Sequence, residues 1–496
     1  MTSRDGGLGV FGAALVALSL VACGSHTPAN PDGGGDAGGG VDSDTPAACA
    51  EAGPVDDSGN APSPVGTQLQ AGAALSVRGV TSDGYLIYSD DNALTLHALA
   101  LAGGQPQDLG ALGAKFWINV VGDVVFSWSN VTDQGVGALG VWSAKTGLHA
   151  ISSASVGIDA TASGDRILYT DHVDANGTGD VYLANVDGSA AVKLLSGMYV
   201  DPCFPQMGFA GTTAVVSFCP AAPPQSGAPN ATVSSFASPA FARVDLVTNA
   251  INYWSTDGTH VLASLANGIV VAPIGGGNPM TLDANGFLGT FGDNGQAVFY
   301  STHSNAFRRS PPTTPAPVTL VPSAFGGVWS FSPDQKWVLF FSNFGATGYD
   351  AYLASAATPS PVTTLWPTAT GAVLGAAFTA DSSHALFVTN IDPCVSSGTL
   401  HAFAVGGGDT VLGHGVFADW AIGGARVLFS DAYAITGGLR FGRADIELVD
   451  LAQSPTPTKL VSRADAVFGL SPAADQLIYS WSVRSAEAGI YVMPVK

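Results

Sequence analysis

The chain has 496 residues and a formal net charge of −21, yet only 11% of its residues are charged. So acidic a chain lacks the basic surface that nucleic acids and anionic membrane surfaces attract, which excludes both as principal partners. The scarcity of charge, together with 63 glycines, predicts a surface of small polar residues, as in many secreted all-β proteins.

Residues 1–22 have the pattern of a secretory signal peptide. Arg4 supplies the positive start, and the apolar run 11–22 is too short to span a bilayer as a helix. Residues 20–23, Leu-Val-Ala-Cys, have lipobox spacing and resemble the end of a bacterial lipoprotein signal. The resemblance implies cleavage before Cys23 and attachment of several acyl chains, which anchor a protein stably where one does not. The alternative is an ordinary secretory signal with an incidental Cys23.

Residues 23–63 predict an acidic, disordered linker. The segment is rich in Gly, Asp, Ala, Pro and Ser and contains neither Lys nor Arg. Because it has few large apolar side chains, it cannot bury enough surface to fold. About forty flexible residues span roughly 35 Å, which is enough to hold the rest of the chain clear of lipid headgroups. We expect this segment to be a spacer.

Beyond the linker, ten apolar strands recur, and their last residues lie 37 to 51 residues apart. Repeats of this length, built of short strands and Gly/Asp/Pro turns, are typical of β-propeller blades. The predicted strands cover 85–89, 124–128, 167–170, 214–218, 261–264, 297–301, 337–342, 385–389, 427–430 and 477–481.

The seventh and last repeats carry a recognisable motif. In the seventh, a Ser332-Pro333-Asp334 turn precedes the apolar strand, and the last repeat ends on the strand 490–493, Ile-Tyr-Val-Met. These features resemble the TolB-type, WD40-like propeller repeat, in which a Ser-Pro-Asp-Gly turn precedes an apolar strand and an Ile-Tyr-Val-Met-Asp strand follows. Other repeats depart from that turn, so the resemblance implies the fold rather than the TolB role.

The predicted fold class is therefore all-β, with residues 64–496 forming about ten four-stranded units in one ring. The last unit ends after its third strand, and the segment 64–69 resembles the fourth strands of other units. We expect this N-terminal strand to close the ring, which leaves no open sheet edge. Eight or nine blades, or two smaller tandem propellers, are the alternatives. No linker-like shift in composition occurs at 283–286, which favours one ring.

Four cysteines follow the lipobox, and an exported chain reaches an oxidising compartment. Cys203 and Cys219 are symmetric about Gly211, so a hairpin that turns there places them opposite each other and predicts a disulfide. That pairing leaves Cys49 and Cys394 as a second predicted disulfide. No two of these cysteines have the Cys-x-x-Cys spacing of metal sites.

The third repeat contains the one candidate metal site. Asp171, Asp174, Asn176 and Asp180 offer oxygen atoms at alternating positions, as calcium loops do. The segment lacks the closing Glu of an EF-hand, and an ordinary turn is the alternative. We predict no other cofactor.

Catalytic motifs are not found. The chain has no Gly-x-Ser-x-Gly nucleophile elbow, and its nine histidines are scattered among the repeats without metal-ligand spacing. We therefore predict a non-enzymatic binding or scaffold module. The alternative is a propeller enzyme, of lyase or hydrolase type, whose active site forms where distant residues meet at the channel mouth.

Long connections between second and third strands are predicted in repeats three, four, seven, eight and nine, for example at 220–238, 390–398 and 431–444. These connections emerge on the same face of a propeller, so we expect that face to bind a protein, peptide or glycan, although tolerated loop insertions are the alternative. The sequence thus predicts a monomeric lipoprotein of the bacterial cell envelope. Gly24 after the lipid-attachment cysteine favours the outer membrane over the inner one.

Overall fold

A computed structural model describes residues 63–132, 135–161, 163–199, 207–219, 231–292, 295–304, 306–321, 326–345, 348–356, 363–367, 373–392, 397–417, 419–434, 442–465, 467–483 and 485–495. These residues form antiparallel β-strands and one short 3-10 helix, η2 (Ser485–Glu487), and they contain no helix long and apolar enough to cross a membrane. The predicted all-β fold class is confirmed. The proposed signal peptide and linker lie outside the described residues.

Three four-stranded sheets come first. They consist of β2 (Leu75–Val80), β3 (Tyr85–Asp90), β4 (Thr95–Ala100) and β5 (Gln107–Ala111); β6 (Trp117–Val121), β7 (Val124–Ser129), β8 (Gly137–Ser143) and β9 (Gly147–Ser155); and β10 (Ile158–Ala160), β11 (Arg166–Asp171), β12 (Thr178–Asn185) and β13 (Val192–Tyr199).

A seven-stranded sheet follows. It consists of β14 (Met207–Ala210), β15 (Thr213–Phe218), β16 (Ala231–Phe236), β17 (Arg243–Thr256), β18 (His260–Leu265), β19 (Gly268–Pro273) and β20 (Met280–Asp283). The 14-residue strand β17 pairs with β16 through its first part and with β18 through its second. This sheet therefore contains both the fourth and the fifth predicted units, and the number of blades stays a prediction.

Five four-stranded sheets complete the fold. They consist of β21 (Gly286–Phe291), β22 (Ala297–Ser301), β23 (Ala306–Ser310) and β24 (Val318–Val321); β25 (Gly326–Phe331), β26 (Trp337–Gly345), β27 (Gly348–Ser355) and β28 (Thr363–Trp366); β29 (Val373–Phe378), β30 (His384–Asp392), β31 (Ser397–Ala404) and β32 (Asp409–Val416); β33 (Asp419–Ala421), β34 (Arg426–Ala434), β35 (Arg443–Asp450) and β36 (Ser454–Asp465); and β37 (Phe468–Leu470), β38 (Gln476–Trp481), β39 (Gly489–Pro494) and β1 (Thr67–Ala71).

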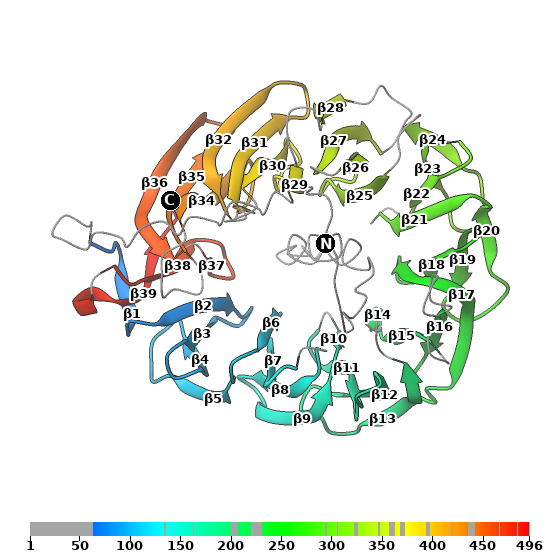
Figure 1. The fold of residues 1–496 in the computed structure, drawn as a ribbon, viewed down its shortest axis with the longest axis horizontal. Coiled ribbons are helices and arrows are strands. Elements are labelled where there is room, and N and C mark those ends of the chain that lie inside the picture. Colours follow the sequence, from blue (N-terminus) through cyan, green and yellow to red (C-terminus); the bar gives the residue numbers. More distant parts are fainter. Residues whose placement is uncertain are drawn as a thin grey trace, which may run out of the picture.

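The sheets stand side by side in one ring (Figure 1), which rules out two tandem rings. The N-terminal strand β1 pairs antiparallel with β39, as predicted, and completes the last sheet. Tyr479 strengthens this closure because its hydroxyl accepts a hydrogen bond from Val65 N (2.8 Å) and donates one to Val65 O (2.5 Å). Across the junction, Val77 N of β2 donates to Ser480 Oγ of β38 (3.2 Å).

The cores lie between neighbouring sheets. One buries Ile87 of the first sheet against Val125 and Trp142 of the second, and another joins Leu86 and Tyr88 of the first sheet to Ile478 of the last. Within several sheets, rings on the second and third strands occupy opposite positions in the register and lie in contact. These pairs are Tyr88 and His97, Tyr169 and Tyr182, Tyr300 and Phe307, Phe340 and Tyr352, Phe387 and His401, and Tyr479 and Tyr491.

A buried hydroxyl organises the turn between first and second strands. Ser332 donates to Asp334 Oδ1 (2.6 Å) and accepts from Trp337 N (3.0 Å), so one side chain holds the turn and the start of β26. Equivalent bonds are made by Thr81, Thr161, Thr379 and Ser471. The turns that depart from the Ser-Pro-Asp-Gly sequence thus keep its hydrogen bonding, because Thr replaces Ser without loss of the hydroxyl.

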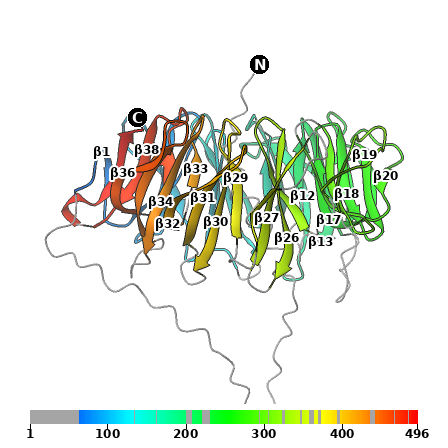
Figure 2. The ribbon, with the colours of Figure 1, turned by 90° about the horizontal axis from the view of Figure 1, so that it is seen from above.

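The connections between second and third strands emerge on one face of the ring, which we call the loop face. Figure 2 shows β26, β30 and β34 extending toward this face. Part of the loop prediction was wrong, because strands continue into the predicted loops: β30 reaches Asp392, β34 reaches Ala434, and β16 begins at Ala231. After Thr389 and after Asp431 the register shifts, a bulge follows, and pairing resumes at Asp392 with Ser397 and at Ala434 with Arg443.

Candidate functional site

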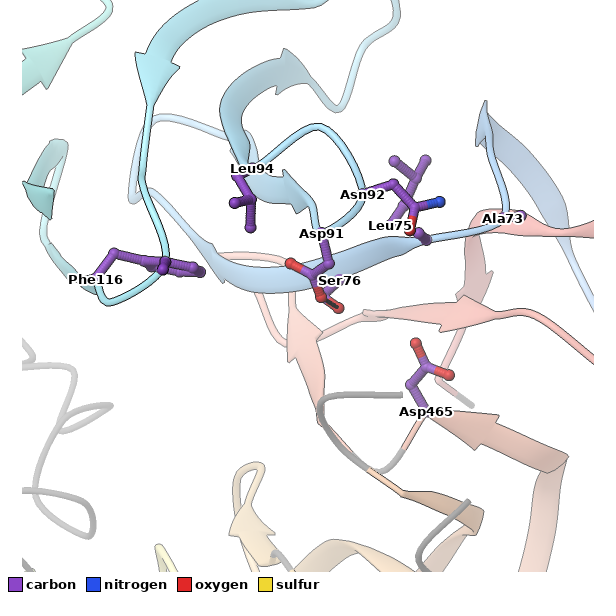
Figure 3. A pocket seen from close by; sticks show the side chains of 10 residues that line it. Ala73, Leu75, Ser76, Asp91, Asn92, Leu94, Phe116 and Asp465 are labelled. Carbon is purple, nitrogen blue, oxygen red and sulfur yellow. Dashed lines mark hydrogen bonds between the residues drawn. The ribbon is translucent and has the colours of Figure 1, made fainter. Parts of the chain in front are cut away.

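A pocket of about 440 Å³ lies between the first sheet and the end of β36 in the second-to-last sheet. The start of β2, the turn after β3, the segment before β6 and the end of β36 line it, and we call it the seam pocket. Asp91 follows the end of β3, and Asp465 pairs with Arg443 at the start of β35, so the pocket opens at the loop face. Figure 3 shows Ser76, Asp91 and Asp465 directed toward the same space.

Asp91 is the centre of a hydrogen-bond network on one wall. Its Oδ1 accepts from Arg78 Nη2 (2.8 Å) and Ser89 Oγ (2.6 Å), and its Oδ2 accepts from Ser76 Oγ (2.6 Å). Arg78 Nε also donates to Ser89 Oγ (2.8 Å). The backbone fixes the position of the carboxylate, because Asp91 N donates to Ala74 O (2.8 Å). Both oxygens of Asp91 are therefore occupied by donors from the protein.

Asp465 faces this network from β36. Asp465 is 7% exposed, and its Oδ1 atom is buried without a hydrogen-bond partner in the described part of the chain. Burial raises the pKa of Asp465 to about 7; the Asp91 carboxylate acts in the same direction, whereas Arg443, the Ser482 hydroxyl and Arg78 act against it. The pocket thus contains a carboxyl group that changes its charge near neutral pH and has an oxygen free to accept a hydrogen bond.

Leu75, Leu94 and Phe116 give the pocket an apolar side. Leu75 and Phe116 are buried, while Leu94 is 36% exposed at the rim. Leu94 has a φ of 52°, in the left-handed region where a leucine is uncommon. The Arg78 guanidinium lies 5.4 Å from the centroid of the Phe116 ring, so the ring also holds the cation that binds Asp91.

His401 makes the hydrogen bonds of a catalytic relay, but in the interior. Its Nδ1 lies 2.8 Å from Asp409 Oδ2, and its Nε2 lies 3.0 Å from Thr389 Oγ1. Thr389 is fully buried and His401 is 3% exposed, so no substrate can reach the hydroxyl. His401 also stacks on Phe387, with centroids 5.0 Å apart. We assign this group to the stability of its sheet.

The calcium candidates are brought only partly together. Asp171 and Asp180 are opposite each other in β11 and β12, but Asp180 is bonded to Lys193 Nζ (2.6 Å). Partial burial acts to raise its pKa, yet the hydrogen bonds it accepts, with that from Lys193 the largest, lower the pKa to about 2. Asp174 instead accepts from Asn176 N and Thr178 N within its own turn. The described residues contain no group of three His, Cys, Asp or Glu side chains that could hold a metal ion.

The register shows that the geometric argument for the first disulfide was wrong. Met207 pairs with Val216 and Ala210 with Thr213, so the hairpin turns between Gly211 and Thr212 rather than about Gly211. Cys219 is buried, which raises the pKa of its thiol, and its backbone bridges to Tyr199. The other four cysteines, Cys23, Cys49, Cys203 and Cys394, lie outside the described residues. Both disulfides and the lipid attachment stay predictions.

Arg78, Asp91 and Asp465 were not predicted from the sequence as site residues. A Ser-Asp-Asp run ends the second strand of the first repeat, but acidic residues are common at strand ends, and Asp465 has no distinctive sequence context. The residues come together only because the ring closes. A signal could have come from the closing strand itself, which places the first and last sheets next to each other.

No family model and no curated protein matches the chain. Among solved structures, a eukaryotic initiation factor is similar with a TM-score of 0.46 and 14% identity, over 69% of this chain and 87% of that chain. Dihydro-heme d1 dehydrogenase NirN in complex with DHE is similar with a TM-score of 0.38 and 13% identity, over 70% and 77% of the two chains. The β-propeller domain of the Trilobed protease from Pyrococcus furiosus has a TM-score of 0.31 and 11% identity, over 60% and 99%. Similarity at this level concerns the fold alone.

Proposed function

We propose that this protein is a ligand-binding β-propeller that holds a protein, peptide or glycan partner in the seam pocket on its loop face. The observation that carries the proposal is the unpartnered, buried Oδ1 of Asp465 at the wall of a pocket of about 440 Å³. A buried acceptor without a donor costs free energy, and a bound ligand that donates to it removes that cost. Pockets of this size, with a few polar groups among apolar ones, are typical of ligand sites.

The proposal includes a place in the cell. Residues 20–23 have lipobox spacing, and the acidic segment after them suits a spacer between a lipid anchor and the ring. The propeller is then a monomer tethered to the bacterial envelope, at the outer membrane rather than the inner one. Metabolic labelling with an alkyne-bearing fatty acid tests this: wild type should be labelled and Cys23→Ser should not. Equal labelling of the two chains would contradict a lipid on Cys23.

A capture experiment tests the binding role. The mature chain is used as bait for envelope extract, beside Ala73→Trp, which places an indole at the exposed rim of the pocket. Gln105→Trp is the matched control, because Gln105 is exposed in the connection between β4 and β5 on the opposite face. A specific partner retained by wild type and the control, and lost by Ala73→Trp, supports the proposal. Equal capture by Ala73→Trp, or capture of nothing by wild type, counts against it.

An acid/base enzyme is the second candidate, and the same pocket motivates it. Asp465 has a pKa of about 7, raised by burial, and shares the pocket with Asp91, an arrangement that acid/base catalysis can use. Two observations favour binding: the oxygens of Asp91 are occupied by donors from the protein, and the pocket-lining residues that the structure describes include no histidine. Envelope glycans and peptides incubated with wild type and Asp465→Asn should remain unchanged by mass spectrometry. Products formed by wild type alone would establish the enzyme.

A further inference from the structure

Asp465 is the one lining residue of the seam pocket with an orphaned acceptor in the described part of the chain. Its carboxyl group projects from β36 toward the residues of the first sheet that line the pocket (Figure 3). A carboxylate oxygen accepts hydrogen bonds and, when ionised, favours a charged donor over a neutral one. The group that complements Asp465 is therefore a donor on the ligand.

The two guanidinium groups that act on the Asp465 carboxyl group, those of Arg78 and Arg443, already have partners. Arg78 bonds to Asp91 and Ser89 and packs over Phe116, and Arg443 Nη2 donates to Ser482 O (3.1 Å). Neither guanidinium donates to Asp465 Oδ1, which has no hydrogen-bond partner among the described residues. A ligand cation would thus add a bond without displacing one. The formal net charge of −21 also attracts cations and repels anions over longer distances.

The remaining surface of the pocket determines what the cation must carry. Leu75, Leu94 and Phe116 lie on the apolar side, and Leu94 remains partly exposed at the rim. Covering the exposed part of Leu94 with an apolar group is favourable, whereas a compact, strongly hydrated metal ion would leave that side chain exposed. The described residues also contain no three carboxylate, histidine or cysteine groups placed for a metal ion.

From these contacts we infer that the seam pocket binds a primary ammonium group attached to an apolar moiety, with Asp465 as its anchor. The inference rests on the proposed binding function and names the class of ligand. A peptide N-terminus and a lysine side chain are two sources of this chemistry. The ammonium donates to the Asp465 carboxylate, and the apolar moiety packs on Leu94 at the rim.

Matched small probes test the class of ligand on the mature chain. We would titrate 2-phenylethylamine, its neutral analogue 2-phenylethanol and the anion 3-phenylpropanoate, and follow binding by ligand-observed NMR at pH 8. The amine should bind about tenfold more tightly than the alcohol, because a hydrogen bond to a charged group is worth more than a neutral one. Asp465→Asn should remove that preference. Asp108→Asn, at an exposed carboxylate on β5, the outer strand of the first sheet, should keep it.

A second variant protects the test against misfolding of the first. Leu94→Asn introduces a residue type that tolerates the φ of 52° at this position, and it removes the apolar contact. It should therefore weaken amine binding without abolishing the preference for the amine over the alcohol. The preference of wild type should also grow from pH 6 to pH 8 as Asp465 ionises in the presence of Asp91, Arg78 and Arg443. Asp465→Asn should lose this pH dependence.

The outcomes separate the ligand class from the binding function. Equal affinity for amine and alcohol, or an unchanged preference in Asp465→Asn, would overturn the ammonium proposal. If the alcohol or the anion binds best and Ala73→Trp blocks it, the pocket is a binding site for another class of ligand. To identify the source, a peptide with a free N-terminus is compared at pH 7 with an acetylated, amidated lysine.

Discussion

Asp465 combines a stability cost with a place in the candidate site. Its carboxyl group is buried, and its pKa is raised to about 7 because water is excluded. In the unfolded chain the same group ionises near its ordinary pKa, about 3.9. The folded state therefore holds the proton more tightly, and this contribution to stability is full below pH 4 and lost as the pH rises toward 7. Such a cost at neutral pH is typical of residues kept for function.

Asp465→Asn should stabilise the protein at pH 8. The neutral amide avoids the cost of ionising a buried carboxyl group, which reaches about 4 kcal/mol when each pKa unit is worth about 1.4 kcal/mol. The midpoint of urea unfolding, followed by tryptophan fluorescence, should be higher in the variant than in wild type at pH 8, and the two should converge toward pH 4. Asp108→Asn should show no such convergence. A variant less stable than wild type at pH 8 would contradict the assigned cost.

A substitution at Ser332 tests the importance of the hydrogen-bonded turn that precedes the second strand of a sheet. Partial burial acts to raise the pKa of Asp334, but hydrogen bonds from Ser332 and from Lys336 lower it, so this contribution to stability exists above the ordinary pKa and disappears as the pH falls. Ser332→Ala leaves Trp337 N without its acceptor and should cost about 1–3 kcal/mol at pH 7. Thr313→Ala, at an exposed loop hydroxyl, is the control for urea unfolding. Equal unfolding midpoints for both variants at pH 7 would contradict the role of this turn. So would a loss of stability in Ser332→Ala that grows below pH 4.

At the scale of the element, the sequence predicted the positions of the second strands well. Each of the ten predicted strands lies in an observed strand, and 297–301 coincides with β22. Their apolar residues face cores on both sides, which makes a continuous run that is easy to recognise. The ends were predicted less well. The strands β30 and β34 continue past Asn390 and Ala432, two residues with left-handed φ, because a bulge restores pairing beyond them.

Two N-terminal deletions test whether the closing strand β1 holds the last sheet in place. A chain without residues 1–62 keeps β1, whereas a chain without residues 1–71 loses it together with the bonds between Val65 and Tyr479. The longer deletion should speed hydrogen exchange at the amides of β39, because their partner strand is gone. The shorter deletion is the control. If β39 exchanges equally slowly in both chains, β1 does not hold the last sheet in place.

For the whole molecule, the ring was predictable and the site was not. Repeated strands and a fourth-strand pattern near residue 64 were enough to predict closure, which β1 and β39 confirm. The pocket depends on side chains at the two ends of the propeller, and Asp91 and Asp465 line one pocket only because the ring closes in three dimensions. No local pattern marks those residues, since each is an ordinary Asp at the end of a strand. The connections between second and third strands emerge on one face, as expected, but paired strands extend into several segments that were predicted to be irregular loops.

The central claim is that a partner binds at the seam pocket on the loop face, and photo-crosslinking from both faces tests it most directly. A photoreactive residue is placed at Asn92, an exposed position that lines the pocket, or at Gln105 on the opposite face, in cells that produce the full chain. We predict a discrete adduct from Asn92 that Ala73→Trp abolishes, and none from Gln105. Adducts from Gln105 alone, equal adducts from both positions, or an Asn92 adduct that survives Ala73→Trp would contradict the claim.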